Sequence, residues 1–434
     1  MEVMSVGEFE HIRCGAEFDP RGRVVTAKQH AALEQFNEDY RRRLKVTVFN
    51  HGAKRSLIAQ NFVGIINLGH HQIEVLPKID GGTTDVRRNL ARMISTALDL
   101  DLYGDSVTRA KRHTESVLEV LIRLFCEQLW KAVRHGMVRR YEPQADNLTV
   151  LRGKLDLSSQ LRVNLARPDR LFCNFDEFTE DNQLNRALKA ALRVLHRVSR
   201  SQSNLRSVAE LLFCFQDVQD IEGHTIKWDS VITDRLSSRY EPLVRLARLF
   251  IAGESPDVVS GTNQGFALLF DMNELFESYI GAIAKRVFGR QGLKVSLQGP
   301  KRHLAQHVSG ADTFALRPDI VVSRGADIAA IIDTKWKRLK GAATREGVSS
   351  GDAYQMHAYS TQYGAPDVML LYPHHSELGA LKARRAEYWF RELGVIPVAG
   401  ARAVSVGTVD LSDLDSVGGQ LQMLFPNLVR STAV

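Results

Sequence analysis

The spacing of apolar residues changes along the chain and predicts three regions. In residues 1–90 short alternating runs at Phe62–Asn67 and Gln72–Leu76 have the period of strands, and Pro77 ends the second run. Apolar positions in Ala27–Leu44 fall on one side of a helix. We therefore predict a β-rich N-terminal domain over residues 1–90 that carries one long helix.

Residues 91–262 favour helices, and we predict a mainly helical middle region. Helical spacing recurs in five runs, and two segments look extended. The helical runs are Arg87–Leu98, Glu115–His135, Gln183–Val198, Leu205–Phe215 and Arg239–Phe250, and the extended segments are Leu151–Leu157 and Leu171–Phe175. The Gly-, Ser- and Pro-bearing stretch Gly253–Gly265 predicts a boundary.

In residues 263–434 the apolar spacing predicts both helices and strands. The expected order is helix Asp271–Phe288, strands Lys294–Leu297, Phe314–Val322 and Ile328–Thr334, helix Ala353–Tyr363, and strand Val368–Tyr372. This order predicts an α/β domain with a mixed central sheet flanked by helices. The fold class of the whole chain is α/β, with an α+β N-terminal part.

Composition narrows the function classes without choosing one. The 434 residues are 44% hydrophobic and 25% charged, as in ordinary globular proteins. We find no apolar run long enough to cross a bilayer, and the first ten residues do not resemble a secretion signal. The four cysteines form no CxxC pair, which fits reduced core residues and a cytoplasmic location. A net charge of +7 permits binding to a polyanion, but taken alone it is better explained by solvated surface charges.

One pair of neighbouring strands carries candidate chemistry. Asp319 follows Pro318 at the start of one strand, and Asp333 ends the next, with thirteen residues between them. A hairpin of this length places both aspartates at the same end of the sheet. Lys335 lies two residues beyond Asp333 and therefore projects to the same face. The alternative is that Asp319 is a turn residue and that Asp333 and Lys335 form a surface ion pair.

Two carboxylates and an amine in this arrangement suit a metal-dependent phosphodiester hydrolase. Mg²⁺ prefers oxygen ligands and commonly takes one or two protein carboxylates, with water and phosphate completing its shell. We assign Asp319 and Asp333 as metal ligands, with the backbone carbonyl of Thr334 as a third candidate. Lys335 would position the attacking water and offset charge in the transition state. Mn²⁺ is an alternative to Mg²⁺.

Residues on the two flanking helices extend this candidate site. Glu277 lies on the helix before the sheet and could hold a second metal or a water, with Glu274 as a rival one turn away. Gln355 and Tyr359 are four residues apart on the helix after Lys335, so they share one face. Solvated helix charges and an amphipathic helix boundary explain these residues equally well.

Taken together, the segments that carry these candidate site residues, with further segments upstream, resemble the McrC family. The members of this family are the nuclease subunits of McrBC-type modification-dependent restriction systems. The resemblance covers most of the chain from Phe62 to Tyr372. Its nuclease segments are Asp271–Glu277, Arg317–Ile320, Asp333–Lys337 and Tyr354–Tyr359, and its upstream segments are Phe62–Ile66, Ile73–Ile79, Leu151–Asp156 and Phe175–Asn182 with Asn185-Arg186.

The resemblance implies a C-terminal PD-(D/E)XK nuclease domain with a restriction-endonuclease-like fold that cuts double-stranded DNA. It also implies a partner, a hexameric AAA+ GTPase of the McrB kind, contacted by the N-terminal region of the chain. Recognition of 5-methylcytosine would belong to that partner. The sequence has no Gly-rich loop ending in GK[ST], which agrees with a nucleotide site outside this chain.

Two other functions stay open at this point. The chain could act chiefly as a non-catalytic regulator of an AAA+ partner, because well over half of it lies outside the nuclease motifs. It could also be a DNA-binding module without cleavage activity, as its positive charge permits.

Overall fold

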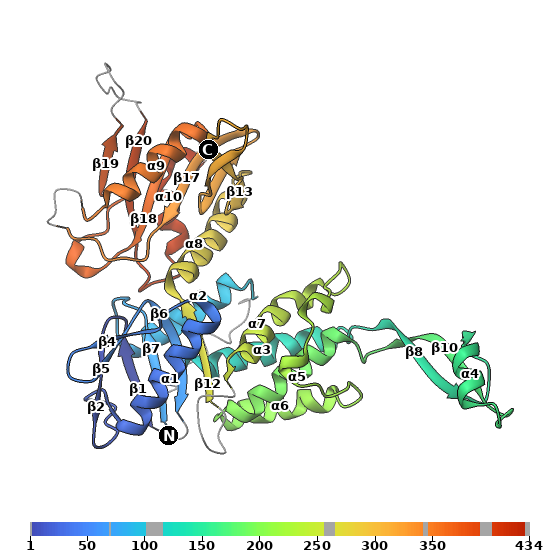
Figure 1. The fold of residues 1–434 in the computed structure, drawn as a ribbon. Coiled ribbons are helices and arrows are strands. Elements are labelled where there is room, and N and C mark those ends of the chain that lie inside the picture. Colours follow the sequence, from blue (N-terminus) through green and yellow to red (C-terminus); the bar gives the residue numbers. More distant parts are fainter. Residues whose placement is uncertain are drawn as a thin grey trace. The chain divides into compact units, whose positions relative to one another are not determined.

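The computed structural model of the chain describes residues 2–68, 71–100, 116–255, 265–341, 346–390 and 402–429. Its contacts divide the chain into two compact units. The first consists of residues 1–117 and 257–434, and the second consists of residues 118–256. The second unit is thus inserted in the sequence of the first (Figure 1). The expected three-domain division stays a prediction, because grouping by contacts does not decide which parts fold alone.

The N-terminal part of the first unit contains two small sheets. In one, strands lie in the order β1 (Glu2–Gly7), β7 (His71–Leu76), β6 (Phe62–Leu68) and β12 (Gly265–Asp271). The other has the order β3 (Val24–Thr26), β2 (His11–Gly15), β5 (Ser56–Ala59) and β4 (Phe49–Gly52). The predicted strands at Phe62–Asn67 and Gln72–Leu76 are confirmed as β6 and β7.

Helix α1 (Ala27–Leu44) has the predicted bounds because its start is capped and its apolar side is buried. The Thr26 side chain accepts from the backbone N–H of Gln29, whose side chain bonds back to the Thr26 N–H, a capping box. Leu33 and Phe36 pack into a core shared with strands β1 and β7. A second helix, α2 (Thr83–Ala97), packs against α8 (Met272–Gly289).

Gly64 allows β6 and β12 to approach each other. Its φ is +134°, and a Cβ at this position would lie 2.0 Å from the Leu268 carbonyl oxygen. Only glycine fits such a backbone at such a distance. Strand β12 thereby pairs antiparallel with β6, although about 200 residues of sequence separate them.

The C-terminal part of the first unit is built on a mixed sheet, as the sequence predicts. The sheet has six strands, two more than the sequence analysis places in it. Its order is β13 (Lys294–Leu297), β16 (Ile320–Arg324), β17 (Asp327–Thr334), β18 (Asp367–Pro373), β20 (Ala403–Val409) and β19 (Ala386–Trp389). The pairs β17–β18 and β18–β20 are parallel, and the other pairs are antiparallel.

Helices cover this sheet. Helix α9 (Ser350–Tyr363) crosses it in Figure 1 and buries Met356 against alternate residues of β17 and β18, including Ile331 and Val368. Helix α8 contacts β13 and β17, and α10 (Val417–Leu424) contacts α8 and β20. A separate two-stranded ribbon, β14 (Arg302–Gln306) with β15 (Asp312–Leu316), lies between β13 and β16 in the sequence.

The sequence prediction of one strand over Phe314–Val322 is wrong. The structure breaks it at Arg317-Pro318-Asp319, with β15 before the break and β16 after it. Proline has no N–H to give to a strand ladder, so the break falls where the pairing is interrupted. What looks like one apolar run in the sequence therefore contains parts of two strands, which belong to two different sheets.

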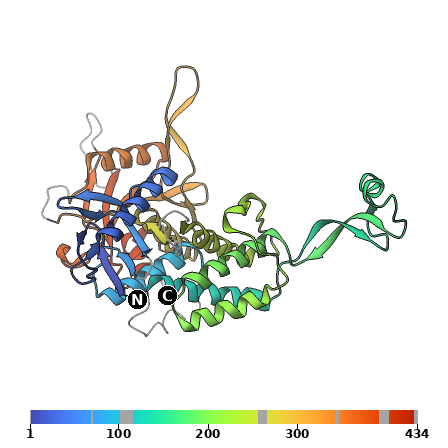
Figure 2. The same cartoon turned by 60° about the horizontal axis from the view of Figure 1, so that its bottom comes forward.

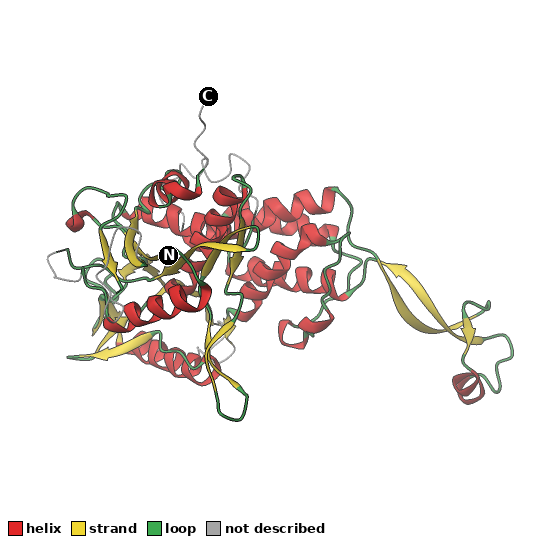
Figure 3. Cartoon of the chain, turned by 90° about the horizontal axis from the view of Figure 1, so that it is seen from above, coloured by secondary structure: helices red, strands yellow, loops and turns green. Residues whose placement is uncertain are grey.

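The second unit is a helical bundle with a long arm. Its main helices are α3 (Val117–Arg134), α5 (Gln183–Val198), α6 (Gln202–Cys214) and α7 (Glu241–Ala252), and α5 packs on both α6 and α7. The arm is an antiparallel ribbon of β8 (Arg140–Leu148) and β10 (Leu171–Thr179), with β9 (Lys154–Leu155) and α4 (Leu157–Val163) toward its far end (Figure 3). The expected boundary at Gly253–Gly265 lies largely outside the described residues. No described helix is long and apolar enough to cross a membrane.

Candidate active site

The two aspartates meet at one end of the C-terminal sheet. Strands β16 and β17 are antiparallel with Ile320 opposite Ile332, so Asp319 comes level with the end of β17. There the backbone N–H and the hydroxyl of Thr334 both donate to Asp319 Oδ2, at 2.8 and 2.9 Å. The juxtaposition that the spacing predicts is therefore present. The use of the Thr334 carbonyl as a metal ligand stays a prediction.

Lys335 lies on the same face as Asp333, as the alternation predicts. Its Nζ is 2.6 Å from Asp333 Oδ2, and Asp333 is only 1% exposed. The same Nζ donates to Gln355 Oε1 at 3.3 Å. Gln355 Nε2 in turn donates to the Tyr359 hydroxyl at 2.8 Å, and that hydroxyl donates to the Arg317 carbonyl at 3.1 Å. The predicted face of α9 thus reaches the lysine and the segment that carries Asp319.

Burial and mutual repulsion shape the electrostatics of this cluster. Burial, followed by the charge of Asp319, raises the pKa of Asp333 to about 6. Burial also raises the pKa of Asp319, although the Thr334 hydrogen bonds oppose this. Burial disfavours the charge on Lys335, but Asp333 outweighs that effect and the pKa of the lysine lies above its usual value. Two buried acids share one amine, so the cluster has a place for a further positive charge.

Glu277, rather than Glu274, is the acid on α8 that faces the aspartates. Burial and the charges of Asp319 and Asp333 raise the pKa of Glu277 to about 7, whereas Glu274 is exposed. The side chain of Gln298, just after β13, donates to Glu277. Gln298 is a contact that the sequence reasoning missed, since a lone glutamine after a strand carries no signal.

Trp336, which directly follows the site lysine, ties the cluster to the N-terminal part of the unit. Its indole N–H lies 2.9 and 3.0 Å from the two carboxylate oxygens of Glu8, which is also buried. The ring centroid of Trp336 is 5.3 Å from that of Phe276, the neighbour of Glu277. The Lys78 backbone N–H donates to Glu8 at 2.9 Å. Sequence reasoning could not find this contact, because 328 residues separate its partners.

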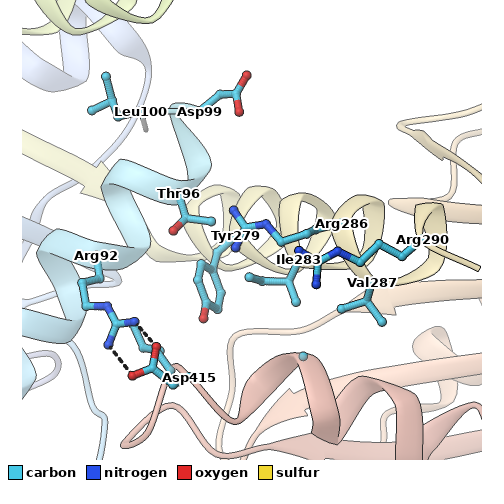
Figure 4. Close-up of a pocket in the computed structure, with 12 residues that line it drawn as sticks. Arg92, Thr96, Asp99, Leu100, Tyr279, Ile283, Arg286, Val287, Arg290 and Asp415 are labelled. Atoms are coloured by element: carbon cyan, nitrogen blue, oxygen red, sulfur yellow. Dashed lines mark hydrogen bonds and ion pairs between the residues drawn. The ribbon is translucent and has the colours of Figure 1, made fainter. Parts of the chain in front are cut away.

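A pocket of about 350 Å³ lies elsewhere, between α2, α8 and the start of α10 (Figure 4). Arg92 there is ion-paired with Asp415, and the side chains of Arg286 and Arg290 run along α8. None of the candidate catalytic residues lines this pocket. The acidic cluster is the candidate site, because buried titratable groups with shifted pKa values converge there.

The cluster fits a hard divalent cation. Its ligand set is carboxylate oxygen, which Mg²⁺ and Mn²⁺ prefer over nitrogen or sulfur ligands. Among the described residues no three His, Cys, Asp or Glu side chains gather closely enough to hold a metal by themselves. The protein would therefore supply two carboxylates, and water and substrate would complete the shell.

Comparison with known proteins identifies the family of this chain. The model of the family described as McrBC 5-methylcytosine restriction system component matches residues 57–373. The chain belongs to the McrBC family. No curated protein matches the chain. The resemblance to McrBC-type restriction systems expected from the motifs is thus confirmed.

Solved structures with the same fold come from Thermococcus gammatolerans. A chain in the half-complex from its tetradecameric assembly of McrB AAA+ hexamers with bound McrC is 20% identical, with a TM-score of 0.67. The match covers 98% of this chain and 100% of that one. A chain of the T. gammatolerans McrBC complex is 23% identical, with a TM-score of 0.50, over 68% of this chain and 89% of that one. At these identities the likeness establishes a shared fold.

Proposed function

We propose that this McrBC-family chain is a Mg²⁺-dependent DNA endonuclease subunit that cleaves modified foreign DNA. The observation that supports the proposal is the gathering of Asp319, Asp333, Lys335 and Gln355 at the end of β17. A cation held by the two aspartates would polarise the scissile phosphate. Burial raises the pKa values of both acids, so a cation bound between them would favour their charged forms.

The remaining residues have roles that their contacts suggest. Gln355 accepts from Lys335 Nζ and so limits the directions in which the amine can point. Lys335 can then orient an attacking water or donate to a phosphate oxygen. Glu277, which faces the aspartates from α8, can hold a water beside them.

Cleavage assays with single substitutions test this proposal. The full chain, its AAA+ partner, GTP and Mg²⁺ are incubated with methylated or unmethylated plasmid. We expect Lys335→Ala and Asp333→Asn each to slow cleavage about a hundredfold or more. Asp327→Asn is the matched control, because Asp327 is exposed at the other end of the same strand. Cleavage by the Lys335→Ala variant at the wild-type rate would rule this site out.

We also propose that the chain works with a hexameric AAA+ GTPase of the McrB kind and stimulates its GTP hydrolysis. The far end of the arm exposes Val150, Leu151, Leu157, Leu161 and Leu165, the last of them 81% exposed. Soluble monomers rarely leave such apolar groups uncovered together, so this end suits a protein partner. The expected contact through residues 1–90 remains a separate proposal.

Substitution at the end of the arm tests the partner proposal. We expect Leu161→Asp with Leu165→Asp to abolish co-purification with the AAA+ protein and the rise in its GTPase rate. Leu236→Asp is the control, since Leu236 is equally exposed in the same unit but outside the arm. Undiminished GTPase stimulation by the double variant would remove the arm from the interface. A chain that stimulates GTP hydrolysis but never cuts DNA would favour the non-catalytic regulator.

A further inference from the structure

The ribbon β14–β15 forms a two-stranded sheet of its own with hardly any cover. All residues of β14 are exposed, and within the turn and β15 Val308 is 99% and Phe314 72% exposed. Figure 2 shows the ribbon standing out beyond the end of α9. An isolated two-stranded ribbon is marginally stable in water, and uncovered aromatic and aliphatic side chains on it point to a partner.

The base of the ribbon is fastened to the candidate active site on both sides. On the incoming side the backbone N–H of Gln298 donates to the Asp319 carbonyl at 2.8 Å, and its side chain donates to Glu277. On the outgoing side the Arg317 carbonyl accepts from Tyr359. The ribbon therefore leaves the body between two residues that contact the acidic cluster.

Helix α9 also clamps the ribbon itself. The Tyr363 hydroxyl is 2.6 Å from the Pro300 carbonyl and 3.0 Å from the Leu316 carbonyl, one on each strand's base. The Arg302 guanidinium lies 4.9 Å from the centre of the Tyr363 ring and bonds to the Gln362 carbonyl. These contacts come from the helix that carries Gln355, so the direction of the ribbon is set by the elements that build the site.

The chemistry of the ribbon suits a nucleic acid. Lys301 and Arg302 bring positive charge to its base, and His303 and His307 follow, against one acid, Asp312. The major groove of duplex DNA accepts a two-stranded ribbon, where apolar side chains meet thymine methyl groups and basic side chains meet phosphates. A duplex whose phosphate lies at the acidic cluster would have the ribbon beside it.

We propose that β14–β15 is a DNA-contacting ribbon that enters the major groove next to the bond being cut. The inference rests on the proposed endonuclease function. It adds that this chain binds the duplex directly, through contacts of its own. The ribbon would hold the DNA in register with the acidic cluster, through Phe314 and Val308 on the groove and Lys301 on the backbone.

Binding and cross-linking test the proposal. The full chain, alone and with its AAA+ partner, carries Asp333→Asn so that DNA stays intact, and its affinity for a duplex is measured in Mg²⁺. We expect Phe314→Ser to weaken binding about tenfold. Met423→Ser is the matched control, an exposed apolar residue on α10. A photoreactive amino acid at Val308 should cross-link to DNA.

The outcomes separate this inference from the proposed function. Unchanged affinity in Phe314→Ser, or cross-links from position 308 only to the AAA+ protein or to a second copy of the chain, would overturn the ribbon's role in DNA binding. Those results leave the cleavage site untouched. Conversely, wild-type cleavage by Asp333→Asn would refute the catalytic site, while a cross-link from the ribbon to DNA would still stand.

Discussion

Asp333→Asn should make the metal-free chain more stable, although the same substitution should slow Mg²⁺-dependent cleavage about a hundredfold or more. Asp333 is buried, and in the folded chain its pKa rises from 3.8 to about 6. A tenfold change in an acid constant corresponds to about 1.4 kcal/mol, so this rise corresponds to about 3 kcal/mol at pH values above 6. Asparagine removes that cost.

The ion pair of Asp333 with Lys335 is already contained in this figure, because the amine lowers the pKa of Asp333 while burial and Asp319 raise it. The variant should therefore be more stable by about 3 kcal/mol, which corresponds to a rise of about 5 °C in the unfolding temperature.

The pH dependence has a definite sign. The pKa of Asp333 is higher in the folded chain than in the unfolded chain, so folding favours the protonated form. That stabilising contribution is complete below a pH of about 4 and is lost as the pH rises through about 6. The advantage of the variant over the wild type should thus be largest above pH 6 and shrink toward pH 4.

Thermal unfolding in EDTA at pH 7.5 and pH 5 measures the difference, with Asp327→Asn as the control that should match the wild type. Added Mg²⁺ should stabilise the wild type by mass action and leave Asp333→Asn nearly unchanged. If Asp333→Asn unfolds at a lower temperature than the wild type at pH 7.5 in EDTA, burial and the charge of Asp319 do not destabilise the Asp333 carboxylate.

Three further substitutions test other parts of the fold. Trp336→Phe keeps the ring but removes the indole donor to a buried carboxylate, so we expect a loss of about 2 kcal/mol in an unfolding titration. Asp181→Asn should lower the free energy of unfolding by about 1 kcal/mol at pH 7, because hydrogen bonds with Arg186 lower the pKa of Asp181. This difference should vanish as the pH falls through the pKa of Asp181. Equal stability of the variant and the wild type at pH 7 would contradict the prediction. Gly64→Ala should yield little soluble protein because its Cβ would strike a carbonyl oxygen, whereas Gly136→Ala, with open space, should cost only about 1 kcal/mol.

The candidate site could be predicted because it depends on local spacing. Alternation along one strand places Asp333 and Lys335 on one face, and a short connection brings Asp319 beside them. The four-residue spacing of Gln355 and Tyr359 works in the same way on a helix. Each inference needs only the period of one element and the length of one turn.

The arm and the ribbon could not be predicted, because the periodic spacing of apolar residues shows only elements that bury one face. Strand β8 contains Pro143 and is exposed on both sides, so its sequence lacks the alternation of a half-buried strand. The segment Leu151–Leu157, which looks extended, instead contains the short β9 and the start of α4, capped by Asp156. The contact between Glu8 and Trp336 is invisible for another reason, since nothing local links residues so far apart.

The pairing of β12 with β6 affects the order in which the chain can fold during synthesis. A ribosome completes β6 at Leu68 but does not reach β12 until Gly265, after the whole helical unit has been made. Until then one edge of β6 has unpaired backbone N–H and C=O groups, which invite pairing with other chains. A fragment that stops at residue 117 would keep that open edge permanently. Pairing of β6 with β12 must therefore wait until the ribosome has made the helical unit, and during that time a neighbouring molecule could supply a strand instead.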